Sequence, residues 1–283
     1  MEGRRRARAR LVLEAACPRA GWTATPRRHD TPSALPVASR DVEPARYLQV
    51  LSERADALID ASQGAMGLEV PTCPGWTVAD LVVHVGLVWG WAADTVSSGT
   101  RAARAPAPED RSEDALRAWA KMQAARLGDA LGAADPEASC WTFGLPRSAR
   151  FWFRRQALET ALHAWDAEGA VGRVARLDPD VAADGVDEHL TVIVPRSVGR
   201  EPGAWSGETV HLHRTDGDGE WVVRLGPDGQ VTAEHAHAKA DLALRGPAEA
   251  LWLWSANRAS AEELGIERFG DETIAERWRT IAF

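Results

Sequence analysis

The sequence predicts a fold in two parts: a four-helix bundle over residues 42–172 and a smaller α+β domain, with a mostly antiparallel sheet, over residues 173–283. In the first part, apolar residues recur at intervals of three and four in four separate segments, which is typical of amphipathic helices. After Gly172 the pattern changes to short alternating segments separated by turn sequences such as TDGDGE and GPDG, which indicates strands. A chain of 283 residues is also long for a single core, so two domains are the natural expectation.

The first two helices of the bundle are predicted at residues 44–62 and from Thr77 or Val78 onward. The first carries apolar residues at helical spacing: Tyr47, Leu48, Leu51, Ala55, Leu58 and Ile59. The second follows a turn rich in proline and glycine, and Asp80 stands three residues after Thr77, as in a capping box. The second helix should therefore start at Thr77 or Val78.

The third helix is predicted over about residues 112–131 and the fourth over residues 151–170. The apolar stripe of the third consists of Leu116, Trp119, Ala120, Leu127 and Leu131. The fourth, FWFRRQALETALHAWDAEGA, has a stripe of Phe151, Leu158, Leu162 and Trp165. The connection over residues 132–150 is long, and loops of this length near a site often carry function. Four helices joined by long loops indicate a bundle.

The α+β part is predicted to begin with a helix and to end with two more. In chain order the expected elements are a helix over 178–194, strands over 208–213, 220–225, 230–235 and 240–245, a buried helix over 247–257 and a short helix over 271–281.

Composition is that of an ordinary soluble globular protein, with 45% hydrophobic and 26% charged residues. The net charge is -8, although nine arginines against three acidic residues lie in the first 40 positions, so the remainder is more acidic still. An acidic folded part argues against nucleic acid as the main partner. Residues 1–41 are predicted to be a disordered or extension tail, because they lack an apolar period.

The cellular setting is predicted to be the cytoplasm, without a membrane partner. No apolar run approaches the roughly 18 residues that a membrane span needs. The three cysteines, Cys17, Cys73 and Cys140, are widely spaced and form no C-x-x-C pair, so neither a disulfide framework nor a cysteine zinc site is indicated. A reducing compartment fits this usage.

A candidate divalent-metal site comes from two of the helices. Glu159 and His163 are four residues apart, which places their side chains on one helical face one turn apart. His84 shares the inward stripe of the second helix with apolar residues. Bundles build metal sites from inward-facing residues on different helices, so these three predict a His2Glu site with at least one open position. The alternatives are an exposed Glu–His pair and a histidine satisfied within the core.

Other patterns are weaker. His211 with His213, and His235 with His237, could each chelate a metal from one face of a strand, but no acidic or third histidine partner is predicted, which favours ordinary exposed strand histidines. The tryptophans near the proposed site could wall a pocket: Trp76, Trp89, Trp91, Trp141, Trp152 and Trp165. The motifs G-x-G-x-x-G, Walker loop, G-x-S-x-G and H-E-x-x-H are absent from the sequence, so nucleotide-binding, α/β-hydrolase and zincin functions lose their main support.

Three blocks of the sequence resemble a known family. VPTCPGWTVADLVVHVG, RRQALETALHAWDAEGA, and LALRGPAEALWLW followed by Asn257 and Arg258 are similar to the mycothiol-dependent maleylpyruvate isomerase family. The resemblance implies a DinB-like amino-terminal bundle, a carboxy-terminal domain similar to sterol-carrier proteins, and a zinc ion held by His84, Glu159 and His163. It also implies that Arg258 meets an acidic substrate, with the site at the interface of the two domains. Asn257 stands where the family usually has Gly.

The function expected from this resemblance is a zinc-dependent isomerase or S-transferase with mycothiol as its thiol cosubstrate and a small electrophilic, acidic substrate. The thiol would occupy the open metal position and add to the electrophile; it then leaves in an isomerase and stays in a transferase. Asp166 could accept the second ring N–H of a ligand histidine, and Arg155 could form an ion pair or meet a carboxylate. Two alternatives stay open: a zinc-dependent hydrolase of a small molecule, and a non-catalytic ligand-binding or regulatory module.

Overall fold

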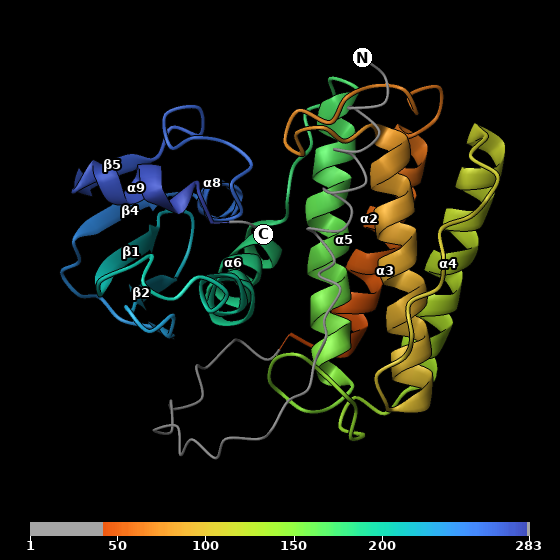
Figure 1. Ribbon diagram of the computed structural model, residues 1–283, viewed down its shortest axis with the longest axis horizontal. Coiled ribbons are helices and arrows are strands. Elements are labelled where there is room, and N and C mark those ends of the chain that lie inside the picture. The colour runs from red at the N-terminus through yellow and green to blue at the C-terminus, as the bar shows by residue number, and fades with distance from the viewer. Residues whose placement is uncertain (1–41, 282–283) are drawn as a thin grey trace.

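The computed structural model describes residues 42–281, and it places a helical bundle beside a part that contains a five-stranded sheet (Figure 1). The predicted tail at residues 1–41 lies outside the described residues. Within residues 42–281, no helix combines the length and the apolar composition needed to cross a bilayer.

The bundle consists of four helices that lie side by side: α2 (Pro44–Ala61), α3 (Val78–Ser98), α4 (Glu113–Ala133) and α5 (Arg150–Ala170) (Figure 1). Helix α5 packs against α2 and α3, and α3 also packs against α4. The four helices predicted from apolar periodicity are confirmed, and each begins within one residue of its predicted start.

Helix α3 begins with the predicted capping box. The Thr77 hydroxyl accepts a hydrogen bond from the Asp80 backbone N–H at 3.3 Å, and the Asp80 carboxylate accepts one from the Thr77 backbone N–H at 3.1 Å. Two of the otherwise unpaired N–H groups at the start of the helix are thereby satisfied. The helix ends at Gly99, whose φ of 67° lies in the left-handed region that glycine adopts without strain. These two ends fix where His84 lies along α3.

Helix α5 is buried around most of its circumference, polar residues included. Its buried polar side chains are Arg155, Gln156, Thr160, His163 and Asp166. Buried polar groups need partners, and one example is the Thr160 hydroxyl, which accepts a hydrogen bond from the Trp89 indole N–H at 2.9 Å. The alternative of a solvated face that carries an exposed Glu–His pair therefore does not describe α5.

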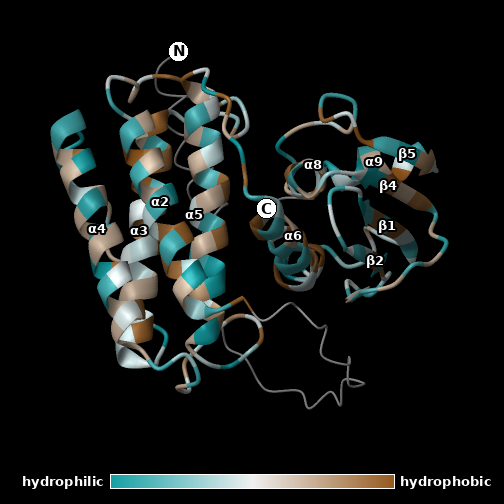
Figure 2. Ribbon diagram, turned by 180° about the vertical axis from the view of Figure 1, so that it is seen from behind, coloured by the Kyte–Doolittle hydropathy of each residue, from teal (hydrophilic) through white to brown (hydrophobic). Residues whose placement is uncertain are grey.

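The helix predicted over residues 178–194 is present with an irregularity. Helix α6 (Pro179–Glu188) continues into a π-helical turn (η1, His189–Ile193) and then into α7 (Val194–Val198). Figures 1 and 2 place α6 between α5 and the sheet. Its side chains contact both parts: Asp184 accepts a hydrogen bond from Tyr47 of α2, and Asp187 accepts one from Trp221, which follows Glu220 in the sheet part.

The sheet contains β1 (Glu208–Arg214), β2 (Glu220–Leu225), β3 (Val231–Glu234), β4 (Leu242–Gly246) and β5 (Glu267–Gly270), in the spatial order β3-β2-β1-β4-β5. The β1–β4 pairing is parallel and the other pairings are antiparallel, which confirms the mostly antiparallel sheet. Strand β5 was not predicted, because all of its residues are exposed and it has no apolar alternation.

Two helices complete the sheet part: α8 (Ala248–Ser255), which packs against α6 and the sheet, and α9 (Glu272–Trp278). Both were predicted, with ends that differ by one to three residues. Helix α8 is almost entirely buried, including Trp252 and Trp254. Its carboxyl end lies near the bundle, because Arg258, three residues beyond it, contacts Asp166 of α5.

Candidate functional site

His84 on α3 and Glu159 and His163 on α5 bring three donor groups to one point between the helices. Both histidine Nε2 atoms face the same Glu159 Oε1, at 3.5 Å for His84 and 3.3 Å for His163. The possible ligand atoms of the three residues all lie within 4.8 Å of one another. Zinc bonds of about 2.0–2.2 Å place neighbouring tetrahedral ligands roughly 3.4 Å apart, so this donor set fits a zinc ion with little movement. We call these side chains the helical triad.

The helical triad is partly open to solvent. The side-chain exposures are 15% for His84, 21% for Glu159 and 9% for His163. His84 faces inward, as its apolar stripe predicted, and keeps a small exposed fraction. A group of three donors with an accessible side can accept a fourth ligand from solution, which is typical of catalytic rather than structural metal sites.

Arg155 holds the Glu159 carboxylate in its ionised form. Its guanidinium donates to Glu159 one turn later and to Glu188 of α6. Burial alone would raise the pKa of Glu159, but the Arg155 charge and hydrogen bonds from His163 and His84 hold that pKa well below its usual range. Of the two roles considered for Arg155, the ion pair is the one present.

Asp166 fixes the orientation of the His163 ring. Its Oδ2 lies 2.9 Å from His163 Nδ1, so Nε2 is left facing Glu159. A carboxylate on one ring nitrogen selects the tautomer whose other nitrogen can bind a metal. Asp166 is fully buried and also accepts hydrogen bonds from the Thr72 hydroxyl, at 2.6 Å, and from Arg258. The contact predicted between Asp166 and a ligand histidine is therefore present.

Arg258 reaches the site but contacts Asp166. Its Nε and Nη2 donate to the Asp166 carboxylate at 2.9 to 3.2 Å, and its Nη1 donates to the Ala256 carbonyl at 2.9 Å. Its side chain is 12% exposed. The guanidinium is therefore largely occupied by partners within the chain, and it links the sheet part to the residue that orients His163.

Asn257 places Arg258 through the backbone. Its φ of 59° is in the left-handed region, which glycine and asparagine tolerate better than other residues. The Arg258 N–H then returns to the Leu253 carbonyl of α8 at 2.8 Å, as in a Schellman motif. The Asn257 side chain donates to the carbonyls of Trp278 and Ile281. Asparagine can thus stand where the resemblance leads us to expect glycine, because it adopts the left-handed backbone conformation and adds two hydrogen bonds.

The pKa values of the two histidines of the helical triad are shifted in opposite directions. Burial lowers the pKa of His84, which keeps its ring neutral and able to act as a ligand. Burial also disfavours charge on His163, but hydrogen bonds to Asp166 and Glu159 outweigh it and raise the pKa. A metal ion at this group would therefore compete with a proton for the His163 ring.

Cys73 lies beside the triad and was not predicted as part of it. Its Sγ is 3.7 Å from Asp166 Oδ2. Burial, followed by the negative charge of Asp166, raises the pKa of Cys73 to about 12, so the thiol is protonated at neutral pH and a poor nucleophile. Cys73, His163 and Asp166 also form a possible metal-ligand group, but Thr72 and Arg258 occupy the Asp166 oxygens. The signal that could have found Cys73 is its place in the same sequence block as His84.

The tryptophans near the site are divided between two environments. The Trp76 ring lies 4.9 Å from the His84 ring and can cover the triad. Trp91, Trp141 and Trp152 pack against one another, with ring centroids 5.2 to 6.2 Å apart. Aromatic stacking of this kind contributes mainly to the core. Of these four, Trp76 is the one in contact with a triad residue.

The strand histidines have an acidic partner, contrary to the sequence-based expectation. His211, His213 and His237 lie around Glu220, with all possible ligand atoms within 4.8 Å of one another. We call these four side chains the strand cluster. The partner was missed because Glu220 belongs to the neighbouring strand, where cross-strand register and not sequence spacing determines proximity. His235 is outside the cluster and contacts Asp187 of α6.

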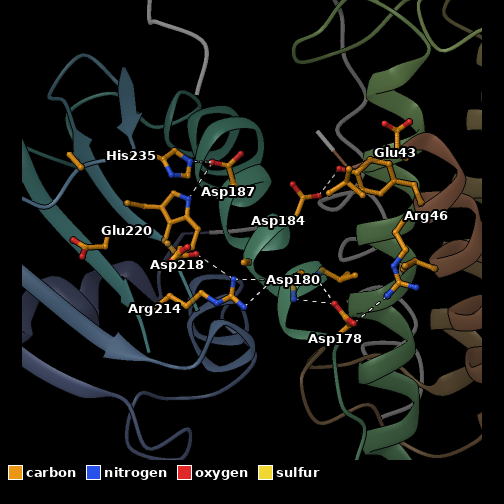
Figure 3. Close-up of a pocket in the computed structure, with 18 of the residues that line it drawn as sticks. Glu43, Arg46, Asp178, Asp180, Asp184, Asp187, Arg214, Asp218, Glu220 and His235 are labelled. Atoms are coloured by element: carbon orange, nitrogen blue, oxygen red, sulfur yellow. Dashed lines mark hydrogen bonds and ion pairs between the residues drawn. The ribbon is translucent and has the colours of Figure 1, made fainter. Parts of the chain in front are cut away.

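A cavity of about 740 Å³ lies between α2, α6 and the beginning of β2 (Figure 3). Its lining includes Tyr47, Asp184, Arg214, Glu220 and His237. The residues of the helical triad are not part of this lining, whereas two residues of the strand cluster are. The cavity therefore borders the strand cluster and not the triad. We place the candidate active site at the triad because its three donors leave a coordination position open.

Comparison with known proteins relates the chain to one family. Residues 47–168 match "Mycothiol maleylpyruvate isomerase N-terminal domain", and residues 180–277 match "MDMPI C-terminal domain". Among solved structures, the mycothiol-dependent maleylpyruvate isomerase has a TM-score of 0.54 at 17% identity, over 78% of this chain and 92% of that chain. A histidine-to-alanine mutant of that isomerase gives the same values. No curated protein matches the chain significantly. At this identity the structural likeness shows a shared fold.

Proposed function

The chain belongs to the mycothiol-dependent maleylpyruvate isomerase family, and we propose that it is a zinc-dependent enzyme that uses a low-molecular-weight thiol. The thiol is mycothiol by family membership, and the other substrate is a small, electrophilic, acidic molecule. The observation that carries the proposal is the convergence of His84 Nε2 and His163 Nε2 on one oxygen of Glu159. Within this proposal the reaction is an isomerisation or an S-transfer.

The helical triad is the set of residues that would hold the zinc ion. When bound, zinc supplies a positive charge that lowers the pKa of a coordinated thiol and stabilises the thiolate nucleophile. The donor set supports this assignment, because two imidazoles and a carboxylate are ordinary zinc ligands. The nearby Cys73 thiol is kept protonated by burial and by Asp166, so it is a poor nucleophile. This supports a thiol from outside the chain as the reactive one.

Residues around the triad orient its ligands and set their charge. Asp166 orients His163 through Nδ1, and Arg155 keeps Glu159 ionised. Arg258, which the resemblance assigned to the acidic substrate, holds Asp166 in place. We propose that Arg258 is chiefly a positioning residue, and that its slight exposure is what would allow direct contact with a substrate carboxylate.

In this proposal, the helical part and the sheet part supply different residues to the site. The triad lies entirely in the helical part, whereas Arg258 comes from the sheet part and reaches across to Asp166. The boundary predicted near residue 172 falls between the two family matches and remains our proposal for the domain division. A site at the interface of two domains is a common arrangement for small-molecule enzymes.

The test combines metal content with thiol dependence. We expect His84→Ala and Glu159→Gln each to lose one bound zinc per chain and to lose thiol-dependent turnover of an electrophile panel. His235→Ala, which removes a histidine that contacts Asp187 away from the triad, is the matched control and should keep both. Unchanged zinc content in both triad variants would rule out the site. Turnover that does not depend on a thiol would favour the zinc-dependent hydrolase, and absence of turnover with any thiol and electrophile would favour a binding module.

A further inference from the structure

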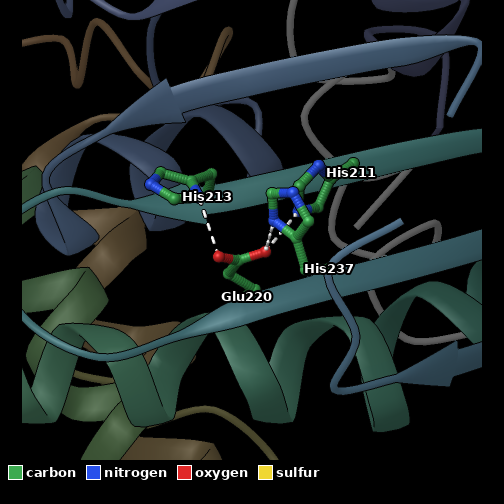
Figure 4. A group of neighbouring side chains, drawn as sticks. All are labelled: His211, His213, Glu220 and His237. Atoms are coloured by element: carbon green, nitrogen blue, oxygen red, sulfur yellow. Dashed lines mark hydrogen bonds and ion pairs between the residues drawn. The ribbon is translucent and has the colours of Figure 1, made fainter. Parts of the chain in front are cut away.

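The strand cluster gathers four potential ligands from β1, β2 and the connection after β3 (Figure 4), whereas the helical triad comes from α3 and α5. His211 and His213 lie two residues apart on β1, so their side chains point to the same side of the strand. The antiparallel register places Glu220, the first residue of β2, directly opposite His213. Three of the four ligands are therefore fixed by regular strand geometry.

His237 reaches the cluster because of the sheet topology. Strand β3 lies at one edge beside β2, whereas β4 lies on the far side of β1. The chain between the end of β3 and the start of β4 must therefore pass β2 and β1. His237 is in this connection, and its ring lies 5.5 Å from the His211 ring and 6.3 Å from the His213 ring.

All three imidazoles face the same carboxylate. Glu220 Oε2 lies 3.1 Å from His211 Nε2 and 2.5 Å from His237 Nδ1, and Glu220 Oε1 lies 3.0 Å from His213 Nδ1. Three imidazole nitrogens thus converge on a single carboxylate, and one of the three, His211, is buried. A divalent cation would satisfy the lone pairs of all four groups at once, since neutral imidazole and carboxylate are its usual protein ligands.

We infer that His211, His213, Glu220 and His237 bind a second zinc ion. Four protein ligands fill a tetrahedral shell, which is the pattern of structural rather than catalytic zinc. The ion would fasten the connection after β3 onto β1 and β2. It would thereby stabilise the rim of the cavity that Glu220 and His237 help to line (Figure 3).

The site is accessible for metal exchange and for mutation. The His237 side chain is 80% exposed, and the Glu220 side chain is 27% exposed. A zinc ion can therefore enter from solution, and replacement of His237 leaves no cavity in the core. His235 provides a matched control in the same connection, because its Nε2 lies 2.7 Å from Asp187 Oδ1 and it does not contact Glu220.

The experiment measures zinc bound per chain in the full-length protein, after chelator treatment, reloading with zinc and removal of the excess. Wild type and His235→Ala are expected to retain two zinc ions, whereas His237→Ala and His213→Ala should retain one. Added zinc should also raise the Tm of a His84→Ala protein, and this rise should be absent when His237→Ala is combined with it.

Equal zinc content in His237→Ala and His235→Ala would overturn the inference, and would show that the cluster is held by hydrogen bonds to Glu220 alone. The outcome is independent of the proposed function. Failure of the helical triad as a zinc site would appear as unchanged zinc content in His84→Ala, whereas failure of the strand cluster would appear in His237→Ala. Cobalt replacement adds a second readout, because tetrahedral cobalt absorbs visible light strongly, and that absorption should fall by about half in His237→Ala.

Discussion

The helical triad and the strand cluster offer the same kinds of donor in different surroundings. The triad has three donors, and the buried side chains of Arg155 and Asp166 hold two of them in place. The cluster has four donors that contact one another, and His237 is largely exposed. Three donors leave a coordination position open, whereas four close it. In the roles proposed for the two groups, donor number and supporting contacts, rather than donor type, distinguish the reactive site from the structural one.

Loss of a triad ligand should have the largest effect. We expect Glu159→Gln to reduce thiol-dependent turnover to near background, because the remaining histidines cannot hold the metal with two protein bonds. His237→Ala should keep at least half of wild-type turnover, since it removes only a cluster ligand. Steady-state kinetics of both purified variants, each loaded with zinc, measure this difference. Similar losses of turnover in the two variants would contradict the assignment of catalysis to the helical triad and of a structural role to the strand cluster.

The reactivity of the Cys73 thiol tests whether the residues around the triad keep this internal thiol from acting as a nucleophile. With a pKa raised to about 12 by burial and by Asp166, its thiolate fraction at pH 8 should be roughly 10³-fold lower than that of an unfolded cysteine, whose pKa is about 8.5. We expect iodoacetamide to modify Cys73 correspondingly more slowly in native than in urea-unfolded protein, with a rate that rises about tenfold per pH unit. Peptide mass spectrometry separates Cys73 from the other cysteines. Rapid native modification at pH 8 would contradict this account.

Asp166→Asn tests whether the contact between Asp166 and His163 strengthens metal binding at the triad. Replacement of the group that orients a ligand histidine typically costs about 10- to 100-fold in metal affinity or activity. It also leaves Arg258 without its buried partner, for which about 3–5 kcal/mol of stability is the usual loss. Competitive zinc titration and urea unfolding measure the two effects. If zinc affinity is unchanged while stability falls, Asp166 is structural and does not act on His163.

Arg258→Lys distinguishes positioning from substrate contact at the same place. A lysine keeps the positive charge but cannot make the forked contact with Asp166. If Arg258 acts through Asp166, we expect weaker zinc binding and a lower kcat with little change in KM. A raised KM with unchanged zinc affinity would assign Arg258 to the acidic substrate instead.

The smallest effect is expected at Asn257. Alanine at its φ of 59° is strained and lacks the two side-chain hydrogen bonds, so Asn257→Ala should lower the free energy of unfolding by about 1–2 kcal/mol. Asn257→Gly keeps the backbone conformation and should lose less. Urea denaturation of the two variants checks the order. Because both variants lack the side-chain hydrogen bonds, a larger loss for glycine would show that the left-handed backbone conformation costs alanine little.

Local patterns predicted much of the fold and the candidate triad. Helical periodicity located all four bundle helices, and the i, i+4 spacing of Glu159 and His163 together with the inward stripe of His84 brought the three residues into one hypothesis. Strand β5 was not predicted, because all of its residues are exposed. Asp166 and Arg258 are 92 residues apart in the sequence, and their contact depends on how α8 docks. Residue spacing cannot predict this docking.

The strand cluster shows where sequence analysis could have gone further. The predicted strands 208–213 and 220–225 are joined by a short turn, so the end of one lies opposite the start of the other. That hairpin geometry would have paired His213 with Glu220. The position of His237 could not be deduced in this way, because it depends on which strand the following connection joins.

The central claim is that the helical triad holds a zinc ion which binds an external thiol. Its most direct test is the optical spectrum of the cobalt-substituted protein during titration with mycothiol. We predict a thiolate-to-cobalt charge-transfer band in the near ultraviolet for wild type and for His237→Ala, and its absence in His84→Ala. A spectrum that stays unchanged on thiol addition, in wild-type protein with cobalt bound at the triad, would contradict the account.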